Sequence, residues 1–344
     1  MNIDKFEEAI MNCRFCFMCR HLSAIGNVRF TEVDTPRVRA AMLYGLRTGT
    51  NSFDDADFVE ALYRQDLSGC CVHHCVNHYD ENGLALAARA DVVEAGKAPE
   101  AVKKLAAKFV KSVGWKAEGK GDVAWFLDET TASDKAVVAA TKKLFAAAKV
   151  APKIITGGSI GKALKVLGYL PEAKEAAEKF AAFLKAEGVK TLVVSNPAAL
   201  SALKQDYAEF GVKLSCNVVS FANFVLGSKV KFPKAAGEVY AIPGDFMRNY
   251  LGCDCQERLL KAVKAVCRPF GTNDEESYNC GEGAVVLDKL HPELVKALAE
   301  YVAARADDPK KDRIVVNSVY AKKALVKYGK LNAVTVDELA ASCL

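Results

Sequence analysis

The sequence has no apolar run long enough to cross a membrane and no stretch of low complexity. A membrane-spanning helix needs ~20 mostly apolar residues in a row, so none is expected. The opening MNIDKFEEAI lacks the charged and then apolar segments of a secretory signal, which predicts a cytoplasmic location. An excess of one charge is also missing, because 47 Lys and Arg are interspersed with 42 Asp and Glu. No concentrated basic face is expected, which argues against a nucleic-acid partner.

Cysteine is absent between residues 76 and 215 but dense before them. The chain has twelve cysteines in 344 residues, and half of them lie in the first 75 residues. In a reducing cytoplasm, such density is more typical of metal ligation or redox chemistry than of disulfides.

From about residue 98, Ala- and Lys-rich helical segments alternate with short β-branched runs. The expected helices are 101–113, 134–148 and 172–187, and the expected strands are 123–127, 153–156 and 190–195. This alternation predicts an α/β fold with parallel sheets.

Several landmarks recur later in the chain, in the same order and at a nearly constant offset. Pro171 and Pro292 each begin a helix that leads to a strand, at 192–194 and at 314–316. We therefore expect three parts, an N-terminal α-helical domain and two duplicated α/β units with parallel sheets. Their boundaries are 1–97, 98–235 and 236–344.

Cys13, Cys16 and Cys19 form a C-x2-C-x2-C motif. Three thiolates at this spacing each bind a different iron of a [4Fe–4S] cluster, and the fourth iron needs a ligand from elsewhere. In two-cluster ferredoxins the fourth cysteine of each run binds the other cluster. A second run here would end in Cys71-x3-Cys75, so Cys75 is the expected fourth ligand.

The other cluster of such a framework is not expected to form. The four ligand positions of that other cluster are occupied by Ser23, Gln65, Ser68 and Cys71. We therefore predict one [4Fe–4S] cluster, with Cys70 and Cys71 spare. Zinc bound by Cys13, Cys16 and another pair is an alternative, as are inert cysteines. A third cysteine at the same step is required for a cubane and redundant for zinc, which favours the cluster.

Segments 12–46, 61–75 and 76–100 resemble the N-terminal ferredoxin-like domain of a family of iron–sulfur subunits. The family includes those of glycolate oxidase, anaerobic glycerol-3-phosphate dehydrogenase and heterodisulfide reductase. The rest of the chain is similar to their two-fold cysteine-rich domain, named for its Cys-Cys-Gly motifs.

The resemblance implies an electron-transfer subunit of a flavin-dependent dehydrogenase or oxidase. A partner subunit containing FAD would oxidise a hydroxy acid, polyol or sugar, so catalysis would reside in that partner. The electrons would pass to a further carrier, such as an electron-transfer flavoprotein, a ferredoxin or a quinone-linked acceptor.

The chain departs from the family pattern in its cysteine-rich half. Gly157-Gly158 and Asn279-Cys280-Gly281 stand where Cys-Cys-Gly is expected, and Asp245 replaces a further cysteine. The remaining cysteines of this half form a weaker candidate for a second metal site. They are Cys253, Cys255, Cys267 and Cys280. Unligated cysteine is commonly just a small buried hydrophobe.

The Gly-rich turn 156–161 lies between a strand and a helix, where backbone N–H groups could cradle a phosphate. It lacks a following Lys-Ser or Lys-Thr, so a turn without a ligand is favoured.

Two other functions remain open at this stage. The C-terminal lobe could be a catalytic domain that binds a substrate or flavin at the carboxyl ends of its strands. The turns that would form this site are 128–131, 157–161, 243–248 and 279–283. The protein could instead be a redox-sensing or assembly protein with a structural cluster.

Arginines near the motif could pair with a partner, offset the charge of a cluster, or form an ordinary solvated face. They are Arg14, Arg20, Arg29, Arg37 and Arg39.

Overall fold

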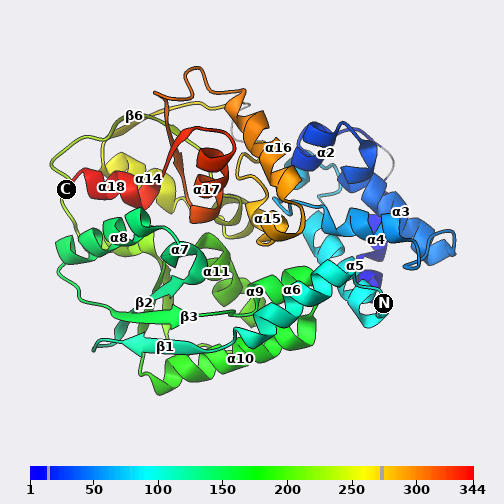
Figure 1. The fold of residues 1–344 in the computed structure, drawn as a ribbon, viewed down its shortest axis with the longest axis horizontal. Helices are drawn as coiled ribbons and strands as arrows, with labels where there is room; N and C mark the ends of the chain where they lie inside the picture. Colours follow the sequence, from blue (N-terminus) through cyan, green and yellow to red (C-terminus); the bar gives the residue numbers. More distant parts are fainter. Residues whose placement is uncertain (14–15, 79, 272–274) are drawn as a thin grey trace.

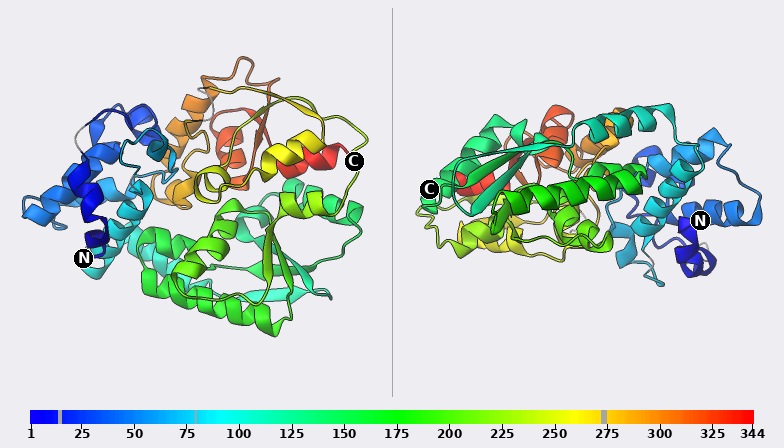
Figure 2. Two further views of the ribbon diagram at one scale, coloured as in Figure 1. Left: turned by 180° about the vertical axis from the view of Figure 1, so that it is seen from behind. Right: turned by 90° about the horizontal axis from the view of Figure 1, so that it is seen from below.

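A helical N-terminal block lies at one end of the molecule, beside two α/β units (Figures 1 and 2). The computed structural model describes residues 1–13, 16–78, 80–271 and 275–344. The α-helices of the block are α1 (Glu7–Asn12), α2 (Ala24–Arg29), α3 (Pro36–Thr48), α4 (Ala56–Tyr63), α5 (Glu81–Glu94) and α6 (Glu100–Lys111). Its 3₁₀ turns are η1 (Asn2–Phe6), η2 (Glu32–Asp34) and η3 (Cys70–His73).

Side-chain caps fix where several of these helices begin. Ser23 accepts a hydrogen bond from the Gly26 amide at the start of α2. Asp55 and Asp80 cap α4 and α5 in the same way. Such caps satisfy backbone N–H groups that a helix leaves unpaired in its first turn.

The first α/β unit contains a five-stranded sheet in the order β1-β3-β2-β4-β5. Its strands are β1 (Trp115–Glu118), β2 (Val123–Asp128), β3 (Lys153–Gly157), β4 (Thr191–Val194) and β5 (Asn217–Ser220). Only β1 runs antiparallel to its neighbour, with Trp115 opposite Gly157. The helices are α7 (Glu129–Ala132), α8 (Lys135–Ala147), α9 (Lys162–Leu167), α10 (Leu170–Ala186), α11 (Pro197–Ser201), α12 (Tyr207–Glu209) and α13 (Phe221–Gly227), with a π-helical turn η4 (Ala202–Asp206).

The second unit contains a four-stranded parallel sheet in the order β7-β6-β8-β9. Its strands are β6 (Gly237–Ala241), β7 (Ala265–Arg268), β8 (Arg313–Val316) and β9 (Asn332–Thr335). The helices are α14 (Cys255–Ala262), α15 (Leu287–Leu290), α16 (Pro292–Ala303), α17 (Val319–Lys327) and α18 (Val336–Ser342), with short turns η5 (Phe246–Tyr250) and η6 (Glu282–Ala284).

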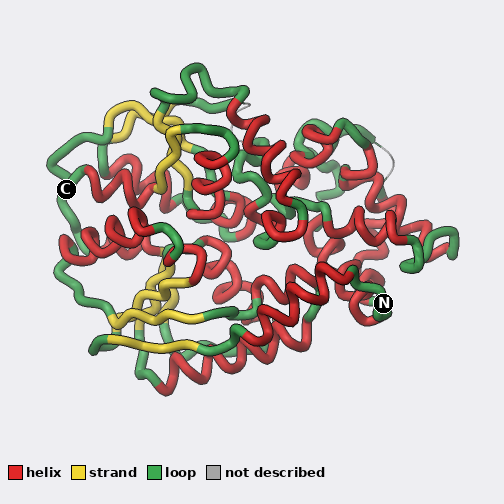
Figure 3. Tube along the Cα trace, viewed as in Figure 1, coloured by secondary structure: helices red, strands yellow, loops and turns green. Residues whose placement is uncertain are grey.

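The mixed α/β class with parallel sheets is confirmed, and helices flank the strands of both units (Figure 3). The order β3-β2-β4-β5 of the first sheet matches β7-β6-β8-β9 of the second. The repeated landmarks predict two related units but no strand order, and the duplication itself remains a prediction. The division at residues 97/98 and 235/236 remains a prediction.

Two apolar cores hold these parts together. One core joins the N-terminal block to α9 and to α16, through residues such as Leu62, Leu164 and Leu298. The other joins the two sheets and the helices packed on them, and includes Trp125, Phe180 and Val315. Among the described residues, no helix combines the length and the apolar character that crossing a membrane requires.

Candidate functional site

Cysteines from two separate segments line one pocket of the N-terminal block. They are Cys13, Cys16, Cys19, Cys71 and Cys75. Cys13 directly follows α1, Cys71 lies in η3, and Cys75 comes just after η3. The structure thus brings the C-x2-C-x2-C motif and Cys75 to one cavity. It adds Cys71, whose place in the pocket the spacing argument did not predict.

Backbone hydrogen bonds hold the two cysteine-bearing turns. The amide of Ser23 donates to the carbonyl of Cys19 at 3.2 Å, just before α2 begins. The amide of Cys75 donates to the carbonyl of Val72, also at 3.2 Å. The remaining wall of the pocket is formed by Met18, Pro36, Arg37, Val72 and Glu81.

The sulfur atoms of this pocket are too widely spread for a single metal ion. Among the described residues, no three cysteine sulfurs lie within 4.8 Å of one another. Four thiolates on one tetrahedral zinc, with Zn–S of ~2.3 Å, would lie about 3.8 Å apart. A cubane cluster spreads its thiolates because each binds a different iron. The sulfur atoms of the described cysteines are therefore not gathered around a single-ion position in this structure.

Burial keeps the thiols of Cys19 and Cys71 protonated when no metal is bound, because it raises the pKa of both groups. It raises the pKa of Cys19 to about 11 and the pKa of Cys71 well above its ordinary value. A metal centre would therefore displace protons as it binds. The backbone N–H of Arg37 acts in the opposite direction and lowers the pKa of Cys19. Arg37 lies in the first turn of α3, where the partial positive charge of the helix favours thiolates.

Glu81 is a buried carboxyl group on the wall of the same pocket. Burial raises its pKa to about 7, while Arg39 and hydrogen bonds from Cys71 pull the pKa down. Cys71 also donates its thiol hydrogen to the carbonyl of Cys19. The Cys71 thiol is therefore already engaged by protein acceptors.

Of the four cysteines of the weaker second metal site, all among the described residues, only Cys253 and Cys255 have thiols within hydrogen-bond reach of each other. Cys255 accepts a hydrogen bond from Ser220 at 3.6 Å, and Cys253 accepts one from Asn223 at 3.8 Å. Cys267 is exposed on β7, whereas Cys280 is buried in the core shared with the N-terminal block. No three of them bring their sulfurs within 4.8 Å of one another. The structure therefore provides no support for a metal bound by this set.

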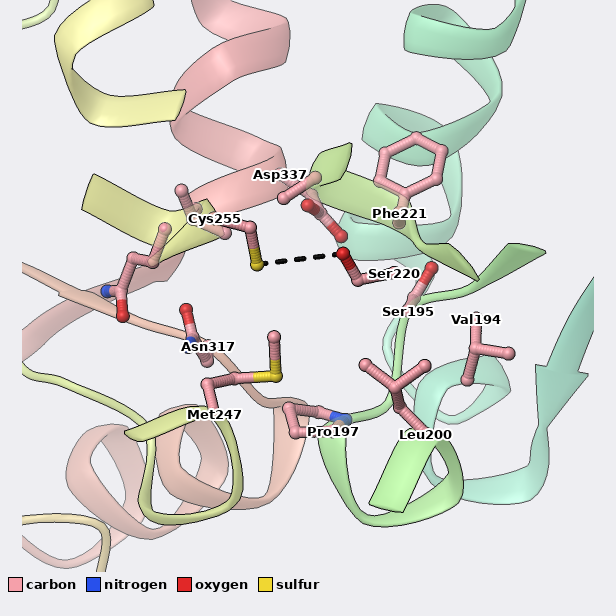
Figure 4. A pocket seen from close by; sticks show the side chains of 13 residues that line it. Val194, Ser195, Pro197, Leu200, Ser220, Phe221, Met247, Cys255, Asn317 and Asp337 are labelled. Carbon is pink, nitrogen blue, oxygen red and sulfur yellow. Dashed lines mark hydrogen bonds between the residues drawn. The ribbon is translucent and has the colours of Figure 1, made fainter. Parts of the chain in front are cut away.

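A second pocket lies between the two sheets, at the carboxyl ends of β4, β5, β8 and β9 (Figure 4). Ser195, Ser220, Asn317 and Asp337 contribute polar groups to its wall. The cavity measures about 30 Å³, which is room for one or two water molecules and far below the ~300–1,000 Å³ of typical small-molecule sites. Of the four turns expected to form a site in this lobe, only 243–248 contributes to it, through Met247. The other lining residues follow strand ends that the sequence argument had not singled out.

Backbone amides of the Gly-rich turn 156–161 donate hydrogen bonds to other groups of the protein. The amides of Gly158 and Ser159 donate to the Gly114 carbonyl and the Ser112 hydroxyl, each at 3.2 Å. The Gly161 amide donates to the Ser159 hydroxyl. A side chain at Gly158 would clash, because its Cβ would lie 1.9 Å from the Ser112 carbonyl oxygen. Close packing thus accounts for this glycine without a phosphate.

The arginines near the cysteine motif mostly pair within the chain. Arg20 and Arg37 both contact Glu32, and Arg29 contacts Asp34. Arg14 lies outside the described residues. Because these arginines already form ion pairs within the chain, the structure gives no support to their pairing with a partner protein.

Comparison with protein-family models, with curated proteins and with solved structures finds no match for this chain.

Proposed function

We propose that this chain is the iron–sulfur electron-transfer subunit of a flavin-dependent dehydrogenase or oxidase complex. The N-terminal block would be a ferredoxin-like domain whose Cys13, Cys16, Cys19 and Cys75 hold one [4Fe–4S] cluster. The observation that carries the proposal is the pocket lined by these four cysteines. When bound, the cluster supplies one-electron transfer at a potential set by its surroundings.

The chain's own residues prepare the pocket for such a group. The Arg37 amide offers a hydrogen bond to the Cys19 sulfur, and donors of this kind tune the potential of a cluster. Met18 and Val72 supply apolar wall. Low local polarity limits the access of water and strengthens the charge interactions of the ligands.

Exposed apolar side chains beside the pocket fit a docking surface for the flavoprotein. Phe17, next to the exposed Cys16, is 67% exposed, and Val76, next to Cys75, is 77% exposed. Contiguous exposed apolar patches commonly mark an interaction site, and these side chains would contribute to such a patch. The partner would carry FAD and oxidise a hydroxy acid, polyol or sugar. The final acceptor would be an electron-transfer flavoprotein, a ferredoxin or a quinone-linked carrier.

The test is electron paramagnetic resonance on anaerobically purified protein before and after dithionite. We expect one cubane signal that appears on reduction and disappears on reoxidation. Cys13→Ser should lose or alter this signal, whereas Cys267→Ser, at an exposed cysteine outside the pocket, should keep it. Iron that cannot be reduced at accessible potentials would favour the redox-sensing or assembly function. Zinc in place of iron would refute electron transfer.

A catalytic or binding function of the C-terminal lobe is a second candidate, suggested by an unpartnered polar group in the pocket between the sheets. The Oε1 atom of Gln256 on its wall is buried without a hydrogen-bond partner. Denaturing the purified chain and examining the supernatant for flavin or another small molecule tests this function. One ligand per chain in the wild type, missing in Met247→Trp, would support this function. If the wild type releases no ligand, the function is contradicted.

A further inference from the structure

Two histidines and a glutamate meet where the N-terminal block approaches the second α/β unit. Each of His21, His74 and Glu275 offers one ligand atom, and the three atoms lie within 4.8 Å of one another. The Nε2 atom of His74 is 3.0 Å from Oε2 of Glu275. The rings of His21 and His74 pack edge to face, with 4.9 Å between their centroids. The three residues come from segments far apart in the sequence.

We propose that His21, His74 and Glu275 form a binding site for one zinc ion, separate from the cysteine pocket. Two imidazoles and one carboxylate are the donor set of zinc sites that keep a fourth position for water. Zinc–ligand distances of ~2.0–2.2 Å require the three atoms to close in by only a small side-chain movement. All three side chains reach solvent at least in part, so an ion can enter.

Hydrogen bonds position the backbone of two of the three ligands. The side chain of Asn27 donates to the His21 carbonyl at 2.7 Å. The guanidinium of Arg248 donates to the Glu275 carbonyl at 3.4 Å. The contact between His74 and Glu275 already aims the carboxylate at the imidazole. A metal ion would take the place of the hydrogen that these two side chains share.

A zinc ion bound at this site would link two parts of the fold. His21 is two residues beyond Cys19, and His74 immediately precedes Cys75. Glu275 belongs to the loop that follows β7 in the second unit. A bound ion would therefore connect both cysteine-bearing turns to this loop. Because the ion binds the folded chain, it should stabilise that chain by mass action.

The test is calorimetric titration of Zn²⁺ into the full chain, anaerobically purified with whatever cluster it carries. We expect one zinc per chain. His21→Ala and Glu275→Gln should each weaken binding by more than the ~10–100-fold that changes around the ligands typically cost. His78→Asn is the matched control, because His78 is an exposed histidine close to His74 but outside the triad. It should bind zinc as the wild type does.

Co²⁺ spectroscopy separates this site from the cysteine pocket. Cobalt bound by the triad should show no thiolate-to-metal charge transfer. A thiolate band, or unchanged zinc affinity in His21→Ala and Glu275→Gln, would overturn the proposal. Iron and sulfide measured in the same samples should be unaffected by His21→Ala. The zinc site and the proposed cluster can therefore fail independently.

Discussion

The thiol of Cys71 donates a hydrogen bond to the backbone carbonyl of Cys19, with 3.5 Å between sulfur and oxygen. Only a protonated thiol can donate in this way, whereas a metal ligand must be a thiolate. Burial raises the pKa of Cys71 well above its ordinary value, which favours the protonated form. In the chain without a metal, Cys71 therefore acts as a hydrogen-bond donor beside the pocket. The spacing of the motif, rather than this bond, selects Cys75 as the proposed fourth ligand.

Cys71→Ala should keep the full iron content and lose about 1–3 kcal/mol of unfolding free energy. The loss reflects one missing hydrogen bond and a small cavity. Iron analysis and urea unfolding of the same preparation measure both quantities. If Cys71→Ala loses iron while Cys75→Ser retains it, the two cysteines have been assigned the wrong roles.

Asp206→Asn should destabilise the protein by about 3–5 kcal/mol, because it leaves two buried ammonium groups without their shared carboxylate. The side chain of Asp206 lies between Lys162 and Lys165, at 3.0 and 2.9 Å. All three side chains are at most 10% exposed. Denaturant unfolding gives the difference.

The matched control for this cluster is Glu209→Gln, which removes a second carboxylate from Lys165. Glu209 is 63% exposed, so its pair is screened by water and should contribute no more than ~1 kcal/mol. Similar losses in the two variants would mean that burial does not set the strength of these ion pairs.

Arg89→Met should cost at least about 3 kcal/mol, because the variant leaves buried carbonyl groups without donors. The guanidinium of Arg89 is 1% exposed and donates to the carbonyls of Leu62 and Val166, at 2.9 and 3.0 Å. These contacts connect α4 and α5 of the N-terminal block to α9. Thermal unfolding measures the effect, with Arg47→Met as the control because Arg47 pairs with the exposed Glu7. A loss below 1 kcal/mol would show that the carbonyls find other partners.

Stability should fall as the pH rises through neutrality, in part because of Asp337 in the pocket between the sheets. Burial, with a smaller effect of Glu338, raises the pKa of Asp337 from 3.8 to about 7. Between these values the folded chain holds a proton that the unfolded chain releases. The stabilising contribution of this proton to the free energy of unfolding is therefore complete below about pH 4 and is lost as the pH rises through about 7. It amounts to at most about 4 kcal/mol.

Asp337→Asn should reduce this pH dependence. Unfolding free energies at pH 5 and pH 8 measure it in the wild type and in the variant. Burial also raises the pKa of Glu282 to about 7, so part of the slope should remain in the variant. An identical slope in both proteins would show that Asp337 does not take up a proton on folding.

Much of the fold could be predicted because it depends on local periodicity. The helix expected at 172–187 and the strand expected at 153–156 lie within one or two residues of α10 and β3. Strand β1 was not predicted, because only alternate residues of this short edge strand are shielded, and Lys116 and Glu118 face solvent. Local sequence does not show that it pairs with β3.

The candidate sites depend on contacts that spacing alone does not encode. Counting along the motif selected Cys75, which lines the pocket. The same counting did not place Cys71 in the pocket, although Cys71 lines it as well. The adjacent Cys70 has its sulfur near the Asn249 side chain instead, since the turn of η3 directs the two thiols differently. The meeting of His21 with Glu275 requires the N-terminal block to pack on the second unit, which no local pattern indicates.

The most direct measurement is iron and acid-labile sulfide per chain in anaerobically purified wild type, Cys75→Ser and Cys267→Ser. The proposed ligand set predicts about four of each in the wild type and in Cys267→Ser, with loss or alteration in Cys75→Ser. About eight irons would mean that a second cluster binds elsewhere in the chain. No iron, with zinc in the cysteine pocket, would contradict the electron-transfer function directly.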